Sequence, residues 1–456
     1  MTETFNLKNI NRVITNRYPK LHNNYLLESS IDSIYWDKYY PVNNYKSDNF
    51  IEFRVPRTVA VFTDLSDINL QFDLQCGKIT TTGTNWRPPS KTAYGDHYDI
   101  VQASAYSIFK HVSLEINSVQ IINVDCFSLN TYIKLLTNYP KDQIKTIGPL
   151  IHLENYHKII DKLDSDNYFT NLKEGDDVYD RLTNLRNKGV FIRAPLILDI
   201  NKINSYLIDG VDMVLRLSLH DDSFIFNTFQ QNDDISSGKK YIYQLSDISL
   251  HVKRVKPSNN SYSALNKSLI PKNVGDNPTL IYPFTSQLSK TYFLSQGIDQ
   301  YIIDLPFGSR IPDKLYFIFQ THSAFNTRDY KTNGLYLSHL NIKNIYITIN
   351  STTVYNINCD FEAKNVAEIY STCLNCLDDR NHLLTFKKYC EGMTLFGFKL
   401  AKHDETGNIT TPLYGVLRIV LTFKNILSEA AVVYMIGEVM SVLSINNNRE
   451  IFLNKT

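Results

Sequence analysis

The feature that most constrains the fold of this chain is a long internal repeat. The segment Glu115–Cys126, EINSVQIINVDC, recurs as Thr348–Cys359, TINSTTVYNINC, with a constant separation of 233 residues. The Ile-Asn-Ser triplet, a later Asn and the final Cys are identical in the two copies. Solenoid repeats are about 20–50 residues long, so a period of this size corresponds to a whole domain. The sequence therefore predicts two similar domains in tandem.

Two weaker similarities occur in the same order along the chain. Gly210–Ser218 resembles Gly415–Phe423 when the two glycines are aligned, and Ser66–Gln75 resembles Pro312–Gln320. Their separations differ from that of the strongest repeat, which indicates that the two domains have loops of different length.

The pattern inside each unit is that of half-buried antiparallel strands. Apolar and polar residues alternate over Ile51–Val55, Leu70–Leu74 and Val112–Ile116, and a period of two is typical of such strands. Short helices are predicted over 129–138 and 364–377, and partial helix over 161–188. Many strands in roughly 200 residues favour an all-β fold of two eight-stranded jelly rolls, a double jelly roll.

Composition suggests where the domains begin and end. We expect an N-terminal arm over 1–45, a first jelly roll over 46–256, a linker over 257–278 and a second jelly roll over 279–456. The arm is rich in Asn and has little periodicity. The linker begins with Pro-Ser-Asn-Asn-Ser, a run typical of connecting segments.

Loops and aromatic residues indicate where other molecules are contacted. Stretches without strand pattern at 77–99, 224–240 and 326–334 are predicted to be long loops that face the outer surface or a neighbouring subunit. Deleting part of 81–91 is expected to weaken assembly while each monomer stays folded. The arm ends in aromatic residues, which bury much area with little loss of rotamer freedom. The predicted subunit contacts are Tyr35, Trp36, Tyr39 and Tyr40.

Charge argues against some classes of partner. Lys plus Arg total 47 and Asp plus Glu total 46, a net charge of +1. This balance argues against a dedicated nucleic-acid or membrane-surface binder, and it leaves little long-range repulsion between copies.

The N-terminus has no apolar signal region, and the most apolar window, 430–437, is shorter than the ~20 residues of a membrane span. We expect a protein that is not secreted through a signal peptide.

Several short motifs along the chain resemble a known family. They are Tyr39-Tyr-Pro41, Ile51-Glu-Phe53, Asp64-Leu-Ser66, Gly210-Val-Asp212 through Arg216, Asp247-Ile-Ser-Leu250 with Val252-Lys-Arg254, Leu305-Pro306, Ala324-Phe-Asn326 and Asp360-Phe-Glu362. Together they cover most of 39–365. In order and spacing they are similar to the double jelly-roll major capsid proteins of Polinton/Maverick elements and adintovirus-like DNA viruses.

The resemblance implies a structural role in a virion. In that family three copies form a pseudo-hexagonal capsomer, because two jelly rolls in each of three chains place six similar barrels around one axis. Capsomers then tile an icosahedral shell. The resemblance implies that the partners are other copies of the chain and a minor or penton capsid protein, with assembly inside the host cell.

Candidate metal sites are weak. Cys373 and Cys376 lie one helical turn apart, and Cys359, Cys390 and His382 are near in sequence. Structural zinc sites usually combine two tight Cys/His pairs, which this spacing lacks, so small buried thiols in a reducing compartment are the preferred interpretation. No metal and no cofactor are predicted.

Other polar runs favour ordinary surface structure over catalysis. Residues 236–240, SSGKK, lack the first Gly and the final Ser or Thr of a phosphate-binding loop. Residues 220–222, HDD, point to alternate faces of an extended chain and are expected to form a solvated turn. Residues 253–256, KRVK, are too short for a basic patch and are interpreted as a polar strand end. No enzymatic activity is predicted.

Two rival functions remain open from the residues alone. A carbohydrate-binding or cell-attachment β-sandwich would also use a jelly roll. It needs polar and aromatic residues or calcium-binding carboxylates clustered on one rim, and no such cluster is evident. A cupin-type enzyme needs several His and a Glu inside a barrel, whereas the 11 His here are scattered.

Overall fold

The computed structural model of the chain describes most of its residues. These are residues 20–21, 31–80, 83–85, 98–151, 153, 190–228, 241–271, 278–326, 332–377, 382–400 and 413–454. Among them no helix is long and apolar enough to cross a membrane.

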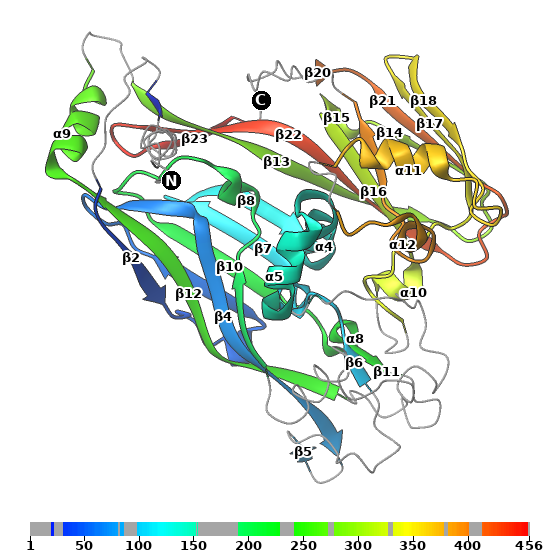
Figure 1. The fold of residues 1–456 in the computed structure, drawn as a ribbon, viewed down its shortest axis with the longest axis horizontal. Helices are drawn as coiled ribbons and strands as arrows, with labels where there is room; N and C mark the ends of the chain where they lie inside the picture. The colour runs from blue at the N-terminus through cyan, green and yellow to red at the C-terminus, as the bar shows by residue number, and fades with distance from the viewer. Residues whose placement is uncertain are drawn as a thin grey trace, which may run out of the picture.

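Two antiparallel sheets form the first half of the molecule (Figure 1). In the first sheet, β12 lies between β2 and β4, and β4 also pairs with β9 and the short β5. The second sheet has the order β3-β10-β7-β8. The strands are β2 (Ile31–Tyr39), β3 (Phe50–Val55), β4 (Phe62–Thr80), β5 (Gly83–Asn85), β7 (Phe109–Ile116), β8 (Val119–Asp125), β9 (Val190–Pro195), β10 (Met213–Leu219) and β12 (Tyr241–Pro257).

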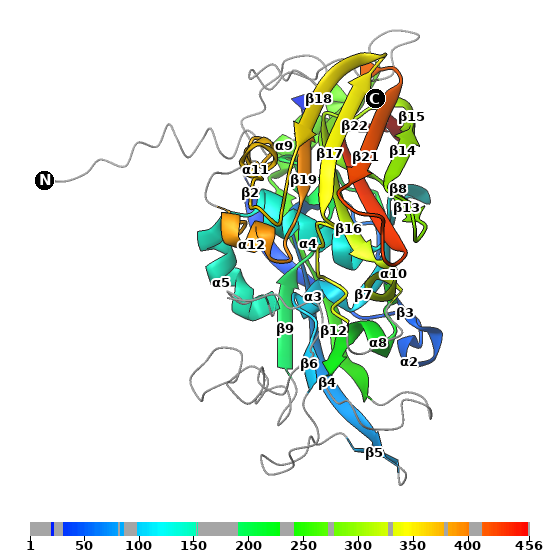
Figure 2. The same ribbon diagram turned by 90° about the vertical axis from the view of Figure 1, so that its right-hand side faces the viewer.

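The second half repeats this arrangement (Figure 2). One sheet has the order β13-β22-β16-β19, with β1 added beside β13 and β23 beside β22, and the other has the order β14-β21-β17-β18. The strands are β1 (Lys20–Leu21), β13 (Thr279–Leu294), β14 (Gln300–Asp304), β16 (Lys314–Thr321), β17 (Ile342–Ile349), β18 (Thr352–Asn358), β19 (Phe396–Lys399), β21 (Leu417–Phe423), β22 (Ala431–Asn446) and β23 (Ile451–Asn454).

Short strands and helices fill the connections. The remaining strands form two small pairs, β6 (Tyr98–Ile100) with β11 (Phe226–Thr228), and β15 (Pro306–Ile311) with β20 (Leu413–Tyr414). The helices are α2 (Tyr45–Asp48), α3 (Ser104–Ser107), α4 (Phe127–Asn138), α5 (Lys141–Ile151), the 3₁₀ helix η1 (Asp199–Lys202), α8 (Asp222–Ile225), α9 (Asn259–Ser268), α10 (His322–Phe325), α11 (Ala367–Leu374) and α12 (Phe386–Cys390).

The strand order confirms two tandem jelly rolls. When the eight main strands of each half are counted along the chain, both halves place the first, eighth, third and sixth in one sheet. Both place the second, seventh, fourth and fifth in the other. Two four-stranded antiparallel sheets joined in this way are a jelly roll. The predicted all-β double jelly roll is therefore correct.

The sequence repeat marks equivalent hairpins. Glu115–Cys126 covers the turn between β7 and β8, and Thr348–Cys359 covers the turn between β17 and β18. Both turn residues have positive φ in each copy, 45° and 64° at Asn117 and Ser118 and 49° and 66° at Asn350 and Ser351. Two-residue hairpin turns of this mirror-image type favour Asn at the first position. The geometry of the turn thus explains why the Asn-Ser pair recurs.

The second similarity, with its two glycines aligned, is one residue out of register with the structure. Aligning Gly210 with Gly415 matches Met213 with Arg418. In the structure Val214 pairs with Glu115 and Arg418 pairs with Thr348, so Val214 is the counterpart of Arg418. A slip of one residue in a strand exchanges the two faces of the sheet, so the sequence alignment would have reversed the inner and outer residues.

Some segments differ from expectation. Residues 31–39, which lack periodicity and were expected to belong to an arm, form β2 and pair with β12. The strand β4 continues to Thr80 into the predicted loop over 77–99, because β12 provides paired backbone up to Lys78 and β5 provides it beyond. Much of the predicted loops, 86–97, 229–240 and 327–331, and the expected helical insertion over 161–188 lie outside the described residues.

The core lies between the two sheets of each jelly roll. Alternate residues of β4 and β7 are buried, as their sequence pattern predicts, and the rings of Phe72 and Phe109 meet edge to face with centroids 6.1 Å apart. The predicted helix over 129–138 is α4, and that over 364–377 contains α11.

Replacing a core side chain tests this assignment. Phe72 is fully buried, so Phe72→Ala is expected to lower the free energy of unfolding by about 3–5 kcal/mol. Leu114→Asp buries an unpaired charge and is expected to prevent folding. On the neighbouring strand β9, Phe191 is 60% exposed, and Phe191→Ala is expected to change stability by less than about 0.5 kcal/mol. Urea unfolding followed by circular dichroism measures both, and equal losses for the two Phe variants would contradict the assignment.

Candidate functional site

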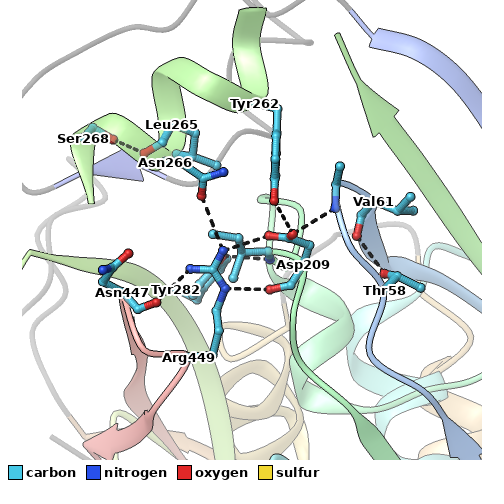
Figure 3. Close-up of polar contacts among 12 residues, drawn as sticks. Thr58, Val61, Asp209, Tyr262, Leu265, Asn266, Ser268, Tyr282, Asn447 and Arg449 are labelled. Atoms are coloured by element: carbon cyan, nitrogen blue, oxygen red, sulfur yellow. Dashed lines mark hydrogen bonds and ion pairs between the residues drawn. The ribbon is translucent and has the colours of Figure 1, made fainter. Parts of the chain in front are cut away.

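An ion pair between a half-buried Arg and a buried Asp joins the two jelly rolls (Figure 3). Arg449 lies in the turn between β22 and β23, and its Nη2 is 2.9 Å from Oδ1 of Asp209 in the first jelly roll. The Nε of Arg449 also donates to the backbone oxygen of Asp209 at 2.8 Å. The other carboxylate oxygen of Asp209 accepts from the backbone N of Ala60 at 2.9 Å and from the Tyr262 hydroxyl at 2.7 Å. The Asp209 side chain is only 4% exposed. Both oxygens of its carboxylate nevertheless have hydrogen-bond or ion-pair partners.

The local backbone is shaped to receive Arg449. Gly210 has φ of 77°, and a Cβ at this position would lie 3.1 Å from Arg449 Nε and 3.2 Å from its Cγ. Glycine adopts this backbone conformation without strain. Asn117 of the repeat completes the contact, since its Nδ2 donates to the Arg449 carbonyl at 2.8 Å and its Oδ1 accepts from Asp212 N at 2.9 Å.

A second polar cluster lies farther along the same junction. Lys134 on α4 and Asp199 on η1 form an ion pair at 2.8 Å, with side chains only 3% and 6% exposed. Asp199 Oδ2 accepts from the backbone N of Gln287 on β13 at 2.9 Å. Asn130 on α4 donates to Gln287 Oε1 at 2.9 Å. Buried charges need such partners, and breaking one pair is strongly unfavourable.

These contacts hold the jelly rolls in one relative orientation. They join the β7–β8 turn, α4 and η1 of the first jelly roll to β13 and to the turn after β22 in the second. The Tyr434 hydroxyl on β22 adds a hydrogen bond to the Asp125 carbonyl at 3.2 Å. The sequence did not predict this junction, because Asp209 and Arg449 are 240 residues apart and no local pattern links them.

The predicted aromatic contact residues lie on and just beyond β2. Trp36 is 41% exposed and Tyr40 is 61% exposed, and Tyr35 is also exposed. Tyr39 differs, because its ring lies 5.8 Å from the Arg254 guanidinium and its hydroxyl is bonded to Asp37 and Arg254. Burial of Tyr39 raises the pKa of its phenol. Thus three of the four side chains are open to solvent, and Tyr39 is half-buried within its own jelly roll.

The β2 strand is an edge strand of its sheet. Among the described residues it pairs with β12 alone. Natural proteins usually protect such edges or use them for pairing with another chain. Exposed Ile34 adds apolar surface next to Trp36.

The cysteines show no arrangement suited to a metal. Within the described part of the chain, no group of three or more His, Cys, Asp or Glu is placed to hold an ion. Burial raises the pKa of the Cys359 and Cys376 thiols to about 12, and it raises the pKa of Cys373 further. A protonated thiol is a poor metal ligand. The Cys359 thiol donates instead to the Ile342 carbonyl at 3.1 Å.

The other polar runs are also engaged in ordinary packing. The ring of His220 stacks on Phe224 at 3.9 Å and its Nε2 lies 3.0 Å from the Ser128 hydroxyl. Burial lowers the His220 pKa to about 3, so the imidazole stays neutral. Lys253 forms ion pairs with Asp64 and Asp67 at 3.5 and 3.2 Å. The run over 236–240 lies outside the described residues.

The same fold occurs in solved viral structures. The chain matches no protein-family model and no curated protein sequence. It is similar to a chain of the Sputnik virophage, with a TM-score of 0.63 and 13% identity over 95% of this chain and 90% of that one. It is similar to the Faustovirus major capsid protein, with a TM-score of 0.57 and 9% identity over 96% and 94%. For the mavirus major capsid protein the TM-score is 0.53, with 8% identity over 100% and 95%.

These likenesses extend over nearly the whole of each chain. The fold is therefore the double jelly roll of viral major capsid proteins, as the strand order already indicated. At such low identity the comparison concerns the fold alone.

Removing the carboxylate of Asp209 tests the junction. Asp209→Ala removes the carboxylate that pairs with Arg449 Nη2 and accepts from Ala60 N and the Tyr262 hydroxyl, and a loss of about 3 kcal/mol in unfolding free energy is expected. The control is Asp304→Ala, which removes the half-exposed Arg418–Asp304 pair and should change stability little. Calorimetric unfolding measures both, and comparable losses would contradict a special role for the junction.

The cysteines give a separate prediction. Because no group of three or more His, Cys, Asp or Glu among the described residues is placed to hold an ion, we expect elemental analysis of purified protein to find no stoichiometric zinc. Zinc that is present in the wild type and lost in Cys373→Ser and Cys376→Ser would contradict this.

Proposed function

We propose that the protein is a structural major capsid protein of a DNA virus or of an integrated viral element. The observation that carries the proposal is a double jelly roll that spans the chain and is shared over at least nine-tenths of the length of each of the three viral chains compared above. Its specificity would lie in contacts between copies, and no catalytic role is assigned. The sequence resemblance further favours the Polinton/Maverick and adintovirus-like group.

Assembly follows from the two barrels in each chain. Three copies would place six similar barrels around one axis and so form a pseudo-hexagonal capsomer. The proposed subunit contacts are Tyr35, Trp36, Tyr39 and Tyr40, of which Tyr39 would act mainly by holding β2 through Arg254. Exposed aromatic side chains of this kind commonly dominate protein interfaces.

The remaining features of the proposal concern partners, place and boundaries. The protein would reside in the virion, assemble inside the host cell, and contact a minor or penton capsid protein. We keep the jelly-roll boundaries at 46–256 and 279–456, with β2 added to the first unit because it pairs with β12. The linker over 257–278 then contains α9.

Solution measurements test the proposal directly. Light scattering of the purified protein is expected to give the mass of a trimer, and electron microscopy is expected to show hexagonal particles or shells. A strictly monomeric protein under all assembly conditions would count against a capsid role. Monomers that bind glycans would favour the alternative of a carbohydrate-binding or cell-attachment protein.

A further inference from the structure

One end of the first jelly roll carries a cavity of about 490 Å³ that is partly open to solvent. Three stretches of chain line it. They are residues 45–49 in and beside α2, residues 219–222 at the end of β10 and the start of α8, and residues 242–245 of β12. The volume falls within the about 300–1,000 Å³ that is typical of small-molecule sites.

Hydrogen bonds bring the three stretches together. Leu219 N donates to the Asn49 carbonyl at 2.9 Å, which joins the end of β10 to the connection between β2 and β3. The Tyr243 hydroxyl donates to the His220 carbonyl at 2.7 Å, which joins β12 to the segment after β10. Strand β10 runs from the junction with the second jelly roll to the cavity. Figure 2 shows α2 and α8 at this end of the first jelly roll.

Several polar side chains of the lining have no partner in the protein. Asp221 directly precedes α8, yet its carboxylate does not cap that helix. Within the part of the chain that the structure describes, the side chains of Lys46, Asn49, Asp221 and Gln244 form no hydrogen bond or ion pair. Polar groups that converge on a cavity in this way are available to a ligand.

Aromatic rings form another part of the lining. Tyr45 and Tyr243 are both half-buried and pack against the core. The hydrogen bond from Tyr243 to His220 holds its ring in place. A tyrosine side chain combines an apolar ring with a polar tip. A ligand that contacts these rings therefore needs an apolar face next to its polar groups.

The charges of the lining disfavour some classes of ligand. Asp221 and Asp222 supply two carboxylates, against the single ammonium of Lys46. Burial lowers the pKa of His220 to about 3, so its imidazole adds no charge. An excess of negative charge repels phosphates, sulfates and carboxylates. A metal ion is also disfavoured, because no group of three or more His, Cys, Asp or Glu among the described residues is placed to hold one.

The free hydrogen-bonding groups match the hydroxyls of a polyol. The carboxylate of Asp221 accepts, the ammonium of Lys46 donates, and the amides of Asn49 and Gln244 do both. A hydroxyl also donates and accepts, so a ligand with several hydroxyls can satisfy all four side chains at once. A sugar carries such hydroxyls around a ring that also has an apolar C–H face.

We propose that this cavity binds a neutral sugar. Tyr45 and Tyr243 contact its C–H face. The side chains of Asp221, Lys46 and Gln244 bind its hydroxyls. The proposal goes beyond the capsid function and is independent of it, because the site is built within one jelly roll and needs no second copy. No polar and aromatic cluster is evident in the sequence, because the three stretches of the lining lie far apart along the chain.

Saturation-transfer NMR on the full-length protein tests the proposal. The neutral probes are the methyl glycosides of mannose, galactose, glucose and fucose, together with N-acetylglucosamine. The acidic comparisons are N-acetylneuraminic acid and glucose 6-phosphate. We expect at least one neutral sugar to bind, and the acidic sugars to bind about tenfold or more weakly than that sugar, because their charge meets the carboxylates of the lining.

Two variants remove groups from the lining. Asp221→Ala removes a charged acceptor and is expected to weaken sugar binding about tenfold or more, whereas Gln244→Ala removes a neutral partner and is expected to weaken it about fivefold. The matched control is Asp299→Ala, which removes an exposed carboxylate between β13 and β14 in the second jelly roll and should leave binding unchanged. Thermal unfolding checks that each variant folds as the wild type does.

Three results would overturn the proposal. They are wild-type protein that binds none of the neutral sugars, binding that both cavity variants retain in full, and stronger binding of the acidic sugars. Each leaves the capsid function standing when light scattering gives a trimer. A protein that never assembles, yet binds a neutral sugar in a way that depends on Asp221, would instead reject the capsid function and support the sugar site.

Discussion

A half-buried guanidinium and a buried carboxylate fix how the two halves of this molecule face one another. Arg449 and Asp209 are separated by 240 residues, yet the Ala60 amide and the Tyr262 hydroxyl are directed to the same carboxylate. Removing two charges from water is unfavourable unless their hydrogen bonds are satisfied, so this arrangement tolerates little rotation between the jelly rolls. Any surface formed by both jelly rolls therefore keeps a fixed shape.

The two jelly rolls share their strand order but differ in the side chains on their outer faces. On the outer face of the first, Arg216 forms ion pairs with Glu52 and Glu115 at 2.8 and 2.6 Å. Strand pairing makes Val420, Ile302 and Thr348 their counterparts in the second. The ion pairs thus stand at different positions on the two outer faces, since the second has its pair between Arg418 and Asp304, two residues from Val420 and Ile302. Pseudo-symmetric positions around an axis would therefore present different chemistry.

The sequence predicted the features that local physics determines. Alternation located the strands, and the Asn-Ser turn, with its two positive φ angles, identified the equivalent hairpins. The sequence did not predict the features that depend on contacts between distant parts of the chain. Consecutive Ile34, Tyr35 and Trp36 show no alternation because both faces of β2 are open, so the strand could not be distinguished from an arm. Likewise, a lone Arg449 gives no sign that its partner lies in the other jelly roll.

Strand order also has a consequence for how the chain is made. In each jelly roll the first strand pairs with the last, β2 with β12 and β13 with β22. During synthesis at about 5–20 residues per second, β2 would wait on the order of 10–40 s for its partner to leave the ribosome. The exposed aromatic residues of β2 would be unpaired throughout that interval, and those of different nascent chains could meet. Production of such a protein in quantity therefore places a demand on the chaperones of the cell that makes it.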